Sequence, residues 1–180
     1  MFIEIVVGVT TVFVVNVLAS LIFFRVRVRV VWLNNTSGQP LFQSPVFISG
    51  GSPPGGQYEL AVEAYPRSVV GRIALARARK KPLILLIAVS SEHVRLLRGS
   101  SNMLSIQEKI ALPLTGAAAQ MADWGRGKLE VEPLGNLIEQ RMTVTHAIRR
   151  RDVVNRRYWW ERFLKIDTVV THLRIESPRA

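Results

Sequence analysis

The carboxylates best placed for acid–base chemistry in this 180-residue chain are two pairs of glutamates. One pair is Glu59 and Glu63, and the other is Glu130 and Glu132. Both spacings place the two side chains on one face of a β-strand, and neighbouring carboxylates can share the transfer of a proton. On a chain with a net charge of +11, such pairs more often form a solvated face or contact arginines. We therefore expect no catalytic role for them.

The three histidines are candidates for metal ligation, but His93, His146 and His172 are far apart in the sequence and no run of acids completes a site. The chain contains no cysteine. This excludes disulfides, cysteine-ligated zinc and iron–sulfur clusters. The sequence therefore predicts no metal site.

Two further patterns fall short of catalytic or cofactor-binding motifs. Ser90 and Ser91 lack the G-x-S-x-G context of an activated nucleophile. The glycine-rich stretch 50–56 is not followed by the Lys-Ser or Lys-Thr of a phosphate-binding loop. We expect no catalytic residue, no cofactor and no enzyme activity. The least favoured hypothesis is an enzyme acting on an anionic substrate, and its participants would be Glu59, Glu63 and His93.

Positive charge is concentrated in segments 67–81 and 149–165, and in a short run after residue 24. The first segment has no acid, and the second has only Asp152 and Glu161. Unbalanced positive charges repel one another unless an anion lies near. We therefore expect a surface that binds a partner or lipid, made of Arg25, Arg27, Arg29, Arg72, Arg77, Arg79, Lys80, Lys81, Arg149, Arg150, Arg151, Arg156, Arg157, Trp159 and Trp160.

Three kinds of partner suit this surface. Basic residues attract anionic lipid headgroups, arginine and tryptophan dominate protein interfaces, and arginines with aromatics can hold nucleic acid. The aromatic cluster at 158–163 has a second interpretation, in which one face of a helix buries Val153, Trp160, Phe163 and Leu164 in the core. The sequence leaves open whether this cluster is core or interface.

Residues 2–24 are almost free of charge and would span roughly 35 Å as a helix, against a hydrocarbon core of about 30 Å. This pattern predicts a transmembrane helix, with Asn16 packing against a partner helix. The arginines that follow predict an external N-terminus and an internal C-terminal domain, in the bacterial cytoplasm, an organelle matrix or stroma, or the cytosol. The alternatives are a cleaved signal peptide and a buried segment of a core.

Periodicity predicts the elements of the inner domain. Alternation over 58–64 and 128–132, the apolar run 82–89 and the β-branched run 168–175 predict strands. Capping residues predict helices at about 115–125, 136–148 and 152–166, and Ser105 to Glu108 has capping-box spacing. This order of elements predicts a small α/β or α+β domain after the membrane helix.

We divide the chain into a membrane anchor with its basic flank (1–33), a Gly/Pro/Asn-rich neck with a short strand (34–57) and a basic domain (58–180). The function predicted for it is that of a non-catalytic, single-span accessory or assembly subunit of a membrane complex. Its partners would be other subunits and anionic lipid headgroups. The alternative is a membrane-tethered protein that binds nucleic acid or the ribosome.

Overall fold

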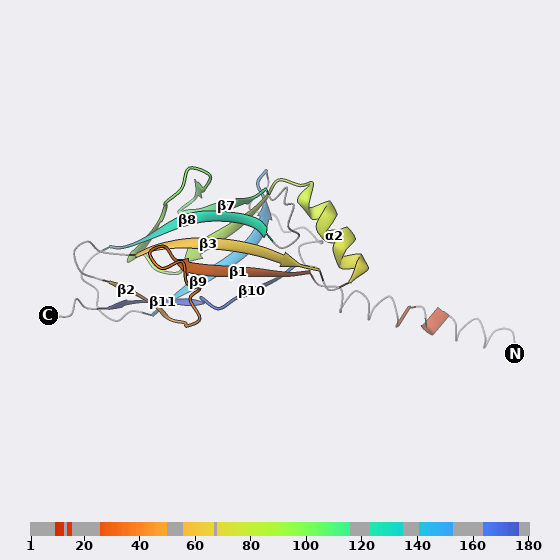
Figure 1. Ribbon diagram of the computed structural model, residues 1–180, viewed down its shortest axis with the longest axis horizontal. Helices are drawn as coiled ribbons and strands as arrows, with labels where there is room; N and C mark the ends of the chain where they lie inside the picture. Colours follow the sequence, from red (N-terminus) through yellow and green to blue (C-terminus); the bar gives the residue numbers. More distant parts are fainter. Residues whose placement is uncertain are drawn as a thin grey trace, which may run out of the picture.

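The structure is a computed structural model that describes residues 10–12, 14–15, 26–49, 56–66, 68–115, 123–134, 141–152 and 164–176. Its described strands form two sheets that pack face to face (Figure 1). The five-stranded sheet has the order β10 (Leu164–Thr168), β1 (Val26–Asn34), β3 (Gly56–Tyr65), β8 (Asp123–Pro133) and β5 (Val94–Arg98). The six-stranded sheet has the order β2 (Val46–Ser49), β11 (His172–Glu176), β9 (Arg141–Arg150), β4 (Leu83–Val89), β7 (Lys109–Leu114) and β6 (Leu104–Ile106). This is the architecture of a β-sandwich.

Strand β1 forms where the sequence alternates valine with arginine. The inward residues Val26, Val28 and Val30 are buried, whereas Arg27 is half-buried and Arg29 is exposed. Successive side chains of a strand point to opposite faces, so this alternation gives one apolar and one charged face. Arg27 and Arg29 therefore belong to a strand and not to the flank of a membrane helix, and the alternation of valine with arginine is itself a strand signal.

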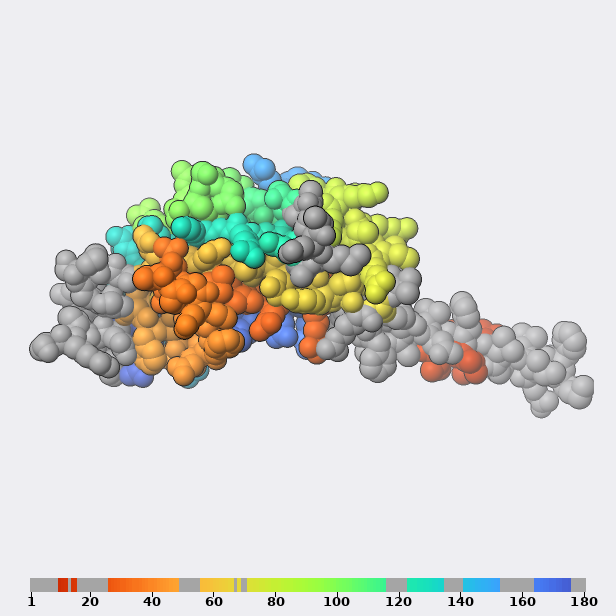
Figure 2. Space-filling view, in the orientation of Figure 1, coloured from red at the N-terminus to blue at the C-terminus, as the bar shows by residue number. Residues whose placement is uncertain are grey.

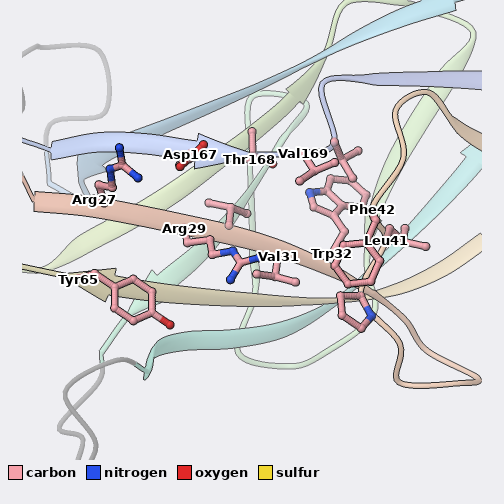
Figure 3. A pocket seen from close by; sticks show the side chains of 13 residues that line it. Arg27, Arg29, Val31, Trp32, Leu41, Phe42, Tyr65, Asp167, Thr168 and Val169 are labelled. Carbon is pink, nitrogen blue, oxygen red and sulfur yellow. The ribbon is translucent and has the colours of Figure 1, made fainter.

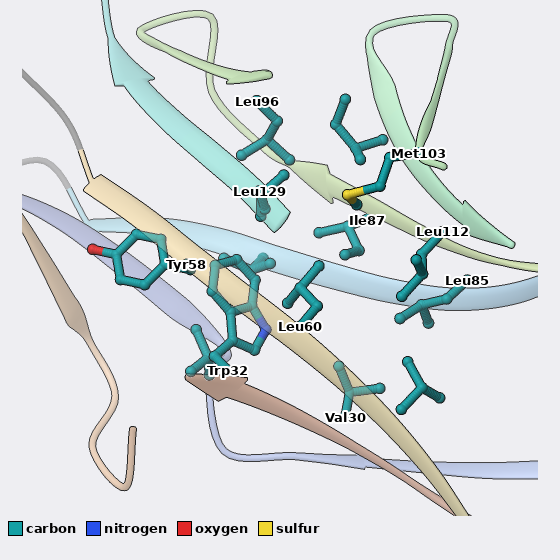
Figure 4. Packing of buried hydrophobic residues seen from close by; sticks show 14 of the residues in the cluster. Val30, Trp32, Tyr58, Leu60, Leu85, Ile87, Leu96, Met103, Leu112 and Leu129 are labelled. Atoms are coloured by element: carbon teal, nitrogen blue, oxygen red, sulfur yellow. The ribbon is translucent and has the colours of Figure 1, made fainter. Parts of the chain in front are cut away.

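The core lies between the two sheets (Figure 4). Trp32 of β1 and Tyr58 of β3 pack with their ring centroids 5.6 Å apart. From the opposite sheet Leu85 and Ile87 of β4 are fully buried in the same cluster. Tilted aromatic pairs of this kind add stability beyond the burial of their area.

The predicted central strand at 82–89 is confirmed as β4, which is buried on both faces. Leu85 and Ile87 face the main core. Ile84 and Leu86 form a second cluster with Ala111 of β7 on the other face of the sheet. A continuous apolar run is the pattern of a strand covered on both sides.

Helix α2 (Val69–Arg79) crosses the end of the sandwich from β3, which precedes it, to β4, which follows it (Figure 1). Its N-cap is Ser68, whose side-chain oxygen accepts a hydrogen bond of 3.0 Å from the backbone N–H of Gly71. Leu75 and Ala78 are buried in the main core. The helix therefore closes this end, and its other side forms the surface there (yellow-green in Figure 2).

The predicted α/β or α+β class is wrong, because segments expected to be helices are strands or turns. The residues expected to form a helix at 136–148 lie in β9 from residue 141 onward, where the inward Met142, Val144 and Ile148 are buried. The expected capping box is the β6–β7 hairpin, with Gln107 and Glu108 at its turn. Cross-strand packing of β-branched residues outweighs the local capping signals in β9.

The other expected helices are only partly described. Of 115–125, residues 116–122 lie outside the described residues, and Trp124 belongs to β8. Of 152–166, residues 153–163 lie outside them, Asp152 lies in a turn after β9, and residues 164–166 belong to β10. The strands predicted at 58–64 and 128–132 are confirmed as β3 and β8. The run 168–175 is divided between the end of β10 and β11.

The predicted integral, single-pass membrane location is also wrong. None of the helices in the described part of the chain has the length and apolar character needed to cross a bilayer. Of the expected span at 2–24, only residues 10–12 and 14–15 are described, and Asn16 lies outside the described residues. Of the arginines behind the predicted orientation, Arg27 and Arg29 belong to the charged face of β1, and Arg25 lies outside the described residues.

Candidate anion-binding surface

The two basic segments of the sequence meet at one end of the sandwich. Helix α2 leads directly into β4, and Leu83 at the start of β4 pairs with Arg150 at the end of β9. The backbone N–H of Arg151 donates a hydrogen bond of 2.8 Å to the carbonyl oxygen of Pro82. We call this region the basic end; it comprises Arg72, Arg77, Arg79, Lys80, Lys81, Arg149, Arg150 and Arg151.

The cations of the basic end differ in their contacts within the described part of the chain. Arg150 forms an ion pair with Asp152, whose Oδ1 accepts a hydrogen bond of 2.9 Å from Arg150 Nε. Lys80, Lys81 and Arg151 are exposed and make no ion pair with any residue that the structure describes. Such a concentration of like charge favours the approach of an anion.

The outward side of α2 combines cations with an exposed apolar side chain. Arg72 and Arg77 are exposed, and neither forms an ion pair within the described segments. Ile73 is 51% exposed and stands four residues before Arg77, so the two side chains share a face of the helix. An apolar side chain among arginines is typical of a protein interface.

A groove of about 420 Å³ lies along the edge of β1 (Figure 3). β10 pairs with β1 only as far as Val30. Further along, Leu33 forms a bridge with Pro40, and the N–H of Leu41 donates to the carbonyl oxygen of Trp32. β10 and the segment 40–41 lie along the same edge of β1 but leave a gap between them, and the groove opens at this gap.

The groove is charged at one end and apolar at the other (Figure 3). Arg27, Arg29 and Tyr65 lie toward the charged end, and Asp167 is the one acid among the described lining residues. The Tyr65 hydroxyl donates a hydrogen bond of 2.7 Å to Glu63, and this bond raises the pKa of Tyr65. The apolar end is formed by Leu41, Phe42 and Val169.

The two glutamate pairs lie on the outer face of the five-stranded sheet. Glu59 is directly opposite Lys128, and Glu63 is opposite Arg29. Gln57 Nε2 donates a hydrogen bond of 2.9 Å to Glu130. These are cross-strand contacts of a solvated face.

The remaining glutamate of these pairs, Glu132, stands opposite Arg95 of β5. His93 lies in the turn just before β5, and the first residue of β5, Val94, pairs with Pro133 at the end of β8. Glu59 and Glu63 instead lie opposite Lys128 and Asp123, which are nearer the start of β8. The structure therefore does not bring His93 together with Glu59 and Glu63.

A second groove, of about 650 Å³, lies between β5 and the β6–β7 hairpin. Its lining includes Arg95 and Arg98, and also Glu92 and Glu108. The signs are balanced here, in contrast to the basic end.

The structure contains a contact between the sheets that sequence reasoning missed. Trp32 Nε1–H donates a hydrogen bond of 3.2 Å to His146 Nε2, and the two rings meet edge to face with centroids 6.0 Å apart. Burial lowers the pKa of His146 from 6.5 to about 4. The alternation of Met142, Val144, His146 and Ile148 in β9 would have placed this histidine on the inward face.

Several residues predicted for the surface lie outside the described residues: Arg25, Arg156, Arg157, Trp159 and Trp160. Arg27 and Arg29 line the groove, and the other predicted cations form the basic end. Within the ranges that the structure describes, no cluster of three histidines or acids is placed to hold a metal ion.

Comparisons with known proteins add no family. No family model matches the chain, and no curated protein matches it. Among solved structures, a chain of a dockerin–cohesin complex aligns with 13% identity and a TM-score of 0.35, covering 85% of this chain and 99% of that one. A likeness at this level carries no argument about fold or function.

Proposed function

We propose that this protein is a non-catalytic accessory subunit that binds an acidic partner protein through its basic end. The observation that supports the proposal is the meeting of two basic segments, distant in sequence, at the hydrogen bond from Arg151 to Pro82. Cations that the fold gathers without an ion-pair partner among the described residues, as at Lys80, Lys81 and Arg151, cost stability through self-repulsion. An acidic partner offsets that cost.

A protein partner fits this surface better than nucleic acid. Nucleic-acid grooves combine cations with exposed aromatic side chains on which bases stack. At the basic end, the large exposed apolar side chain among the described residues is Ile73, which is aliphatic. Arginine beside an apolar anchor is the composition of a protein interface.

The test is a binding titration of the full chain by fluorescence anisotropy. The probes are a labelled glutamate-rich peptide containing leucine, labelled poly-glutamate, a single-stranded RNA and a duplex DNA, at low and physiological salt. The basic-end variant is R77E/K81E/R151E. Its matched control is R95E/R98E/K109E, which reverses three exposed cations on β5 and the β6–β7 hairpin.

We expect the basic-end variant to lose about tenfold or more in affinity for the acidic peptide, or about 1.4 kcal/mol, and the control to change little. Equal losses in the two variants would show that binding follows net charge alone and would contradict the proposal. Tighter binding to RNA or DNA than to the acidic peptide, with a steep dependence on salt, would establish the nucleic-acid alternative instead.

The contribution of Ile73 gives an independent check. Ile73→Ser should weaken binding of the leucine-containing peptide about threefold or more, since an exposed apolar anchor is lost, and leave poly-glutamate binding unchanged. Leu134→Ser is the control, because Leu134 is 44% exposed and lies beyond the end of β8. Loss of poly-glutamate binding by the Ile73 variant would indicate a damaged fold rather than a lost contact.

A further inference from the structure

We infer that the groove along β1 binds an extended peptide segment that carries one acidic side chain next to bulky apolar side chains. The groove is separate from the basic end, and the inference does not depend on the function proposed there. It rests on the position of the groove in the sheet, its charge and its exposed apolar side chains.

The charge of the groove calls for a single anion. Arg27 and Arg29 line it together with one described acid, Asp167, so the described lining carries one net positive charge, although Glu63 stands opposite Arg29 on β3. Neither arginine forms an ion pair with a residue in the described ranges. Because the two arginines are two residues apart, their side chains leave the same face of β1. A guanidinium group can hold a carboxylate through two parallel hydrogen bonds.

The opposite end of the groove calls for apolar side chains. Phe42 is 71% exposed and Val169 is 44% exposed, and both line the groove. Exposed aromatic and aliphatic side chains beside a groove are suited to receive apolar anchors. Trp32, which is 1% exposed and belongs to the main core, also lines the groove.

The length of the groove and its edge strand favour an extended peptide over a compact ligand. The distance along β1 from Arg27 to Val31, both lining residues, is about 13 Å at 3.3 Å per residue. An extended peptide of about four residues covers this distance. β10 is an edge strand of the described sheet, and the end of β10 lines the groove. Edge strands offer unpaired backbone groups to an added strand.

The experiment measures binding of three labelled six-residue peptides to the full chain by fluorescence anisotropy. The first peptide contains one glutamate flanked by valine and phenylalanine. The second replaces that glutamate by glutamine, and the third replaces the apolar residues by serine. We expect the first peptide to bind at least about tenfold more tightly than either of the others. The second peptide lacks the carboxylate for the arginines, and the third lacks the side chains for the apolar end of the groove.

Matched variants locate the binding site. Phe42→Ser and Arg29→Glu should each weaken binding of the first peptide about fivefold or more. The controls Phe47→Ser and Arg95→Glu should leave it unchanged, because Phe47 is 47% exposed on β2 and Arg95 lies on β5. Since Phe42 is exposed, its variant should melt at the same temperature as the parent chain.

Four outcomes would overturn the inference. Equal binding of the glutamate and glutamine peptides would remove the role of the arginines. Equal losses in the groove variants and their controls would place binding elsewhere on the chain. Competition by 4-phenylbutyrate at the affinity of the peptide would assign the groove to a small amphipathic carboxylate. The R77E/K81E/R151E variant should retain peptide binding; if it does not, the peptide binds the basic end.

Discussion

The outer face of the five-stranded sheet and the basic end are both rich in charge, but they arrange it differently. On the outer face Lys128 stands opposite Glu59, and Arg126 forms an ion pair of 3.1 Å with Asp123. At the basic end Lys81 and Arg151 have no ion-pair partner in the described part of the chain. Lys128 and Arg126 on the outer face have acidic neighbours within the described chain, whereas Lys81 and Arg151 form no ion pair there.

The difference shows why net charge is a poor guide to function. A charge of +11 is compatible with a surface of paired charges and with a concentrated basic patch. Because paired surface charges add little to stability, the proposed function rests on cations that form no ion pair with a described residue, such as Lys80, Lys81 and Arg151. These are gathered where α2, β4 and β9 meet.

The largest expected effect on stability comes from the interior and not from either charged surface, and acid titration measures it. His146 has a pKa lowered from 6.5 to about 4 by burial, whereas an unfolded chain protonates it near 6.5. Between these values the unfolded state binds more protons, so the free energy of unfolding falls as pH falls, by about 3 kcal/mol in all. Protonation would also place an N–H on Nε2, facing the Trp32 donor. Chemical denaturation between pH 7 and pH 4 measures this loss.

Two histidine variants identify the source of that pH dependence. His146→Gln should remove most of it, because the glutamine oxygen can accept from Trp32 without titrating. His172→Gln, on β11, should retain it. An unchanged pH profile in the His146 variant would place the titrating group on one of the surfaces.

The paired surface is tested by reversing one of its cations. Lys128→Glu places a carboxylate directly opposite Glu59, and like charges at such positions destabilise a sheet. We expect the free energy of unfolding to fall by about 0.5–1 kcal/mol, measured from denaturant midpoints. Lys109→Glu is the control, because Lys109 pairs with Ile106 and has no acid opposite it. Equal effects in the two variants would show that the outer face is not stabilised by its pairing.

Reversing a cation of the basic end should raise the free energy of unfolding instead of lowering it, and this effect should be the smallest of those predicted. Lys81→Glu relieves repulsion with neighbouring cations, so the free energy of unfolding should rise by about 0.3 kcal/mol at low salt. High salt should remove the gain by screening. A loss of stability would mean that Lys81 is already balanced by an acid, and the contrast between the two surfaces would fail.

Apolar runs and alternating residues predicted strands correctly, whereas capping residues predicted helices where the structure has strands. The apolar run of β4 and the alternation of β3 and β8 were predicted as strands and are strands. The alternation in β1 was equally clear, but its arginines were assigned to membrane topology. In β9 capping residues suggested a helix, although Val144 and Ile148 pack inward as parts of a strand. Capping is worth about 1 kcal/mol, less than the burial of two such side chains.

The sequence by itself determined the residue types of the surface and excluded cysteine chemistry. It predicted a partner- or lipid-binding role for Arg27 and Arg29 of the groove and for all eight residues of the basic end, and that role stays a prediction. The tertiary structure decided which of them meet, because Arg151 and Pro82 come together only when β9 pairs with β4. It also decided that Glu59 and Glu63 face cations across strands. Residue types are local properties of the chain, whereas the balance of charge around each one depends on contacts between segments far apart in the sequence.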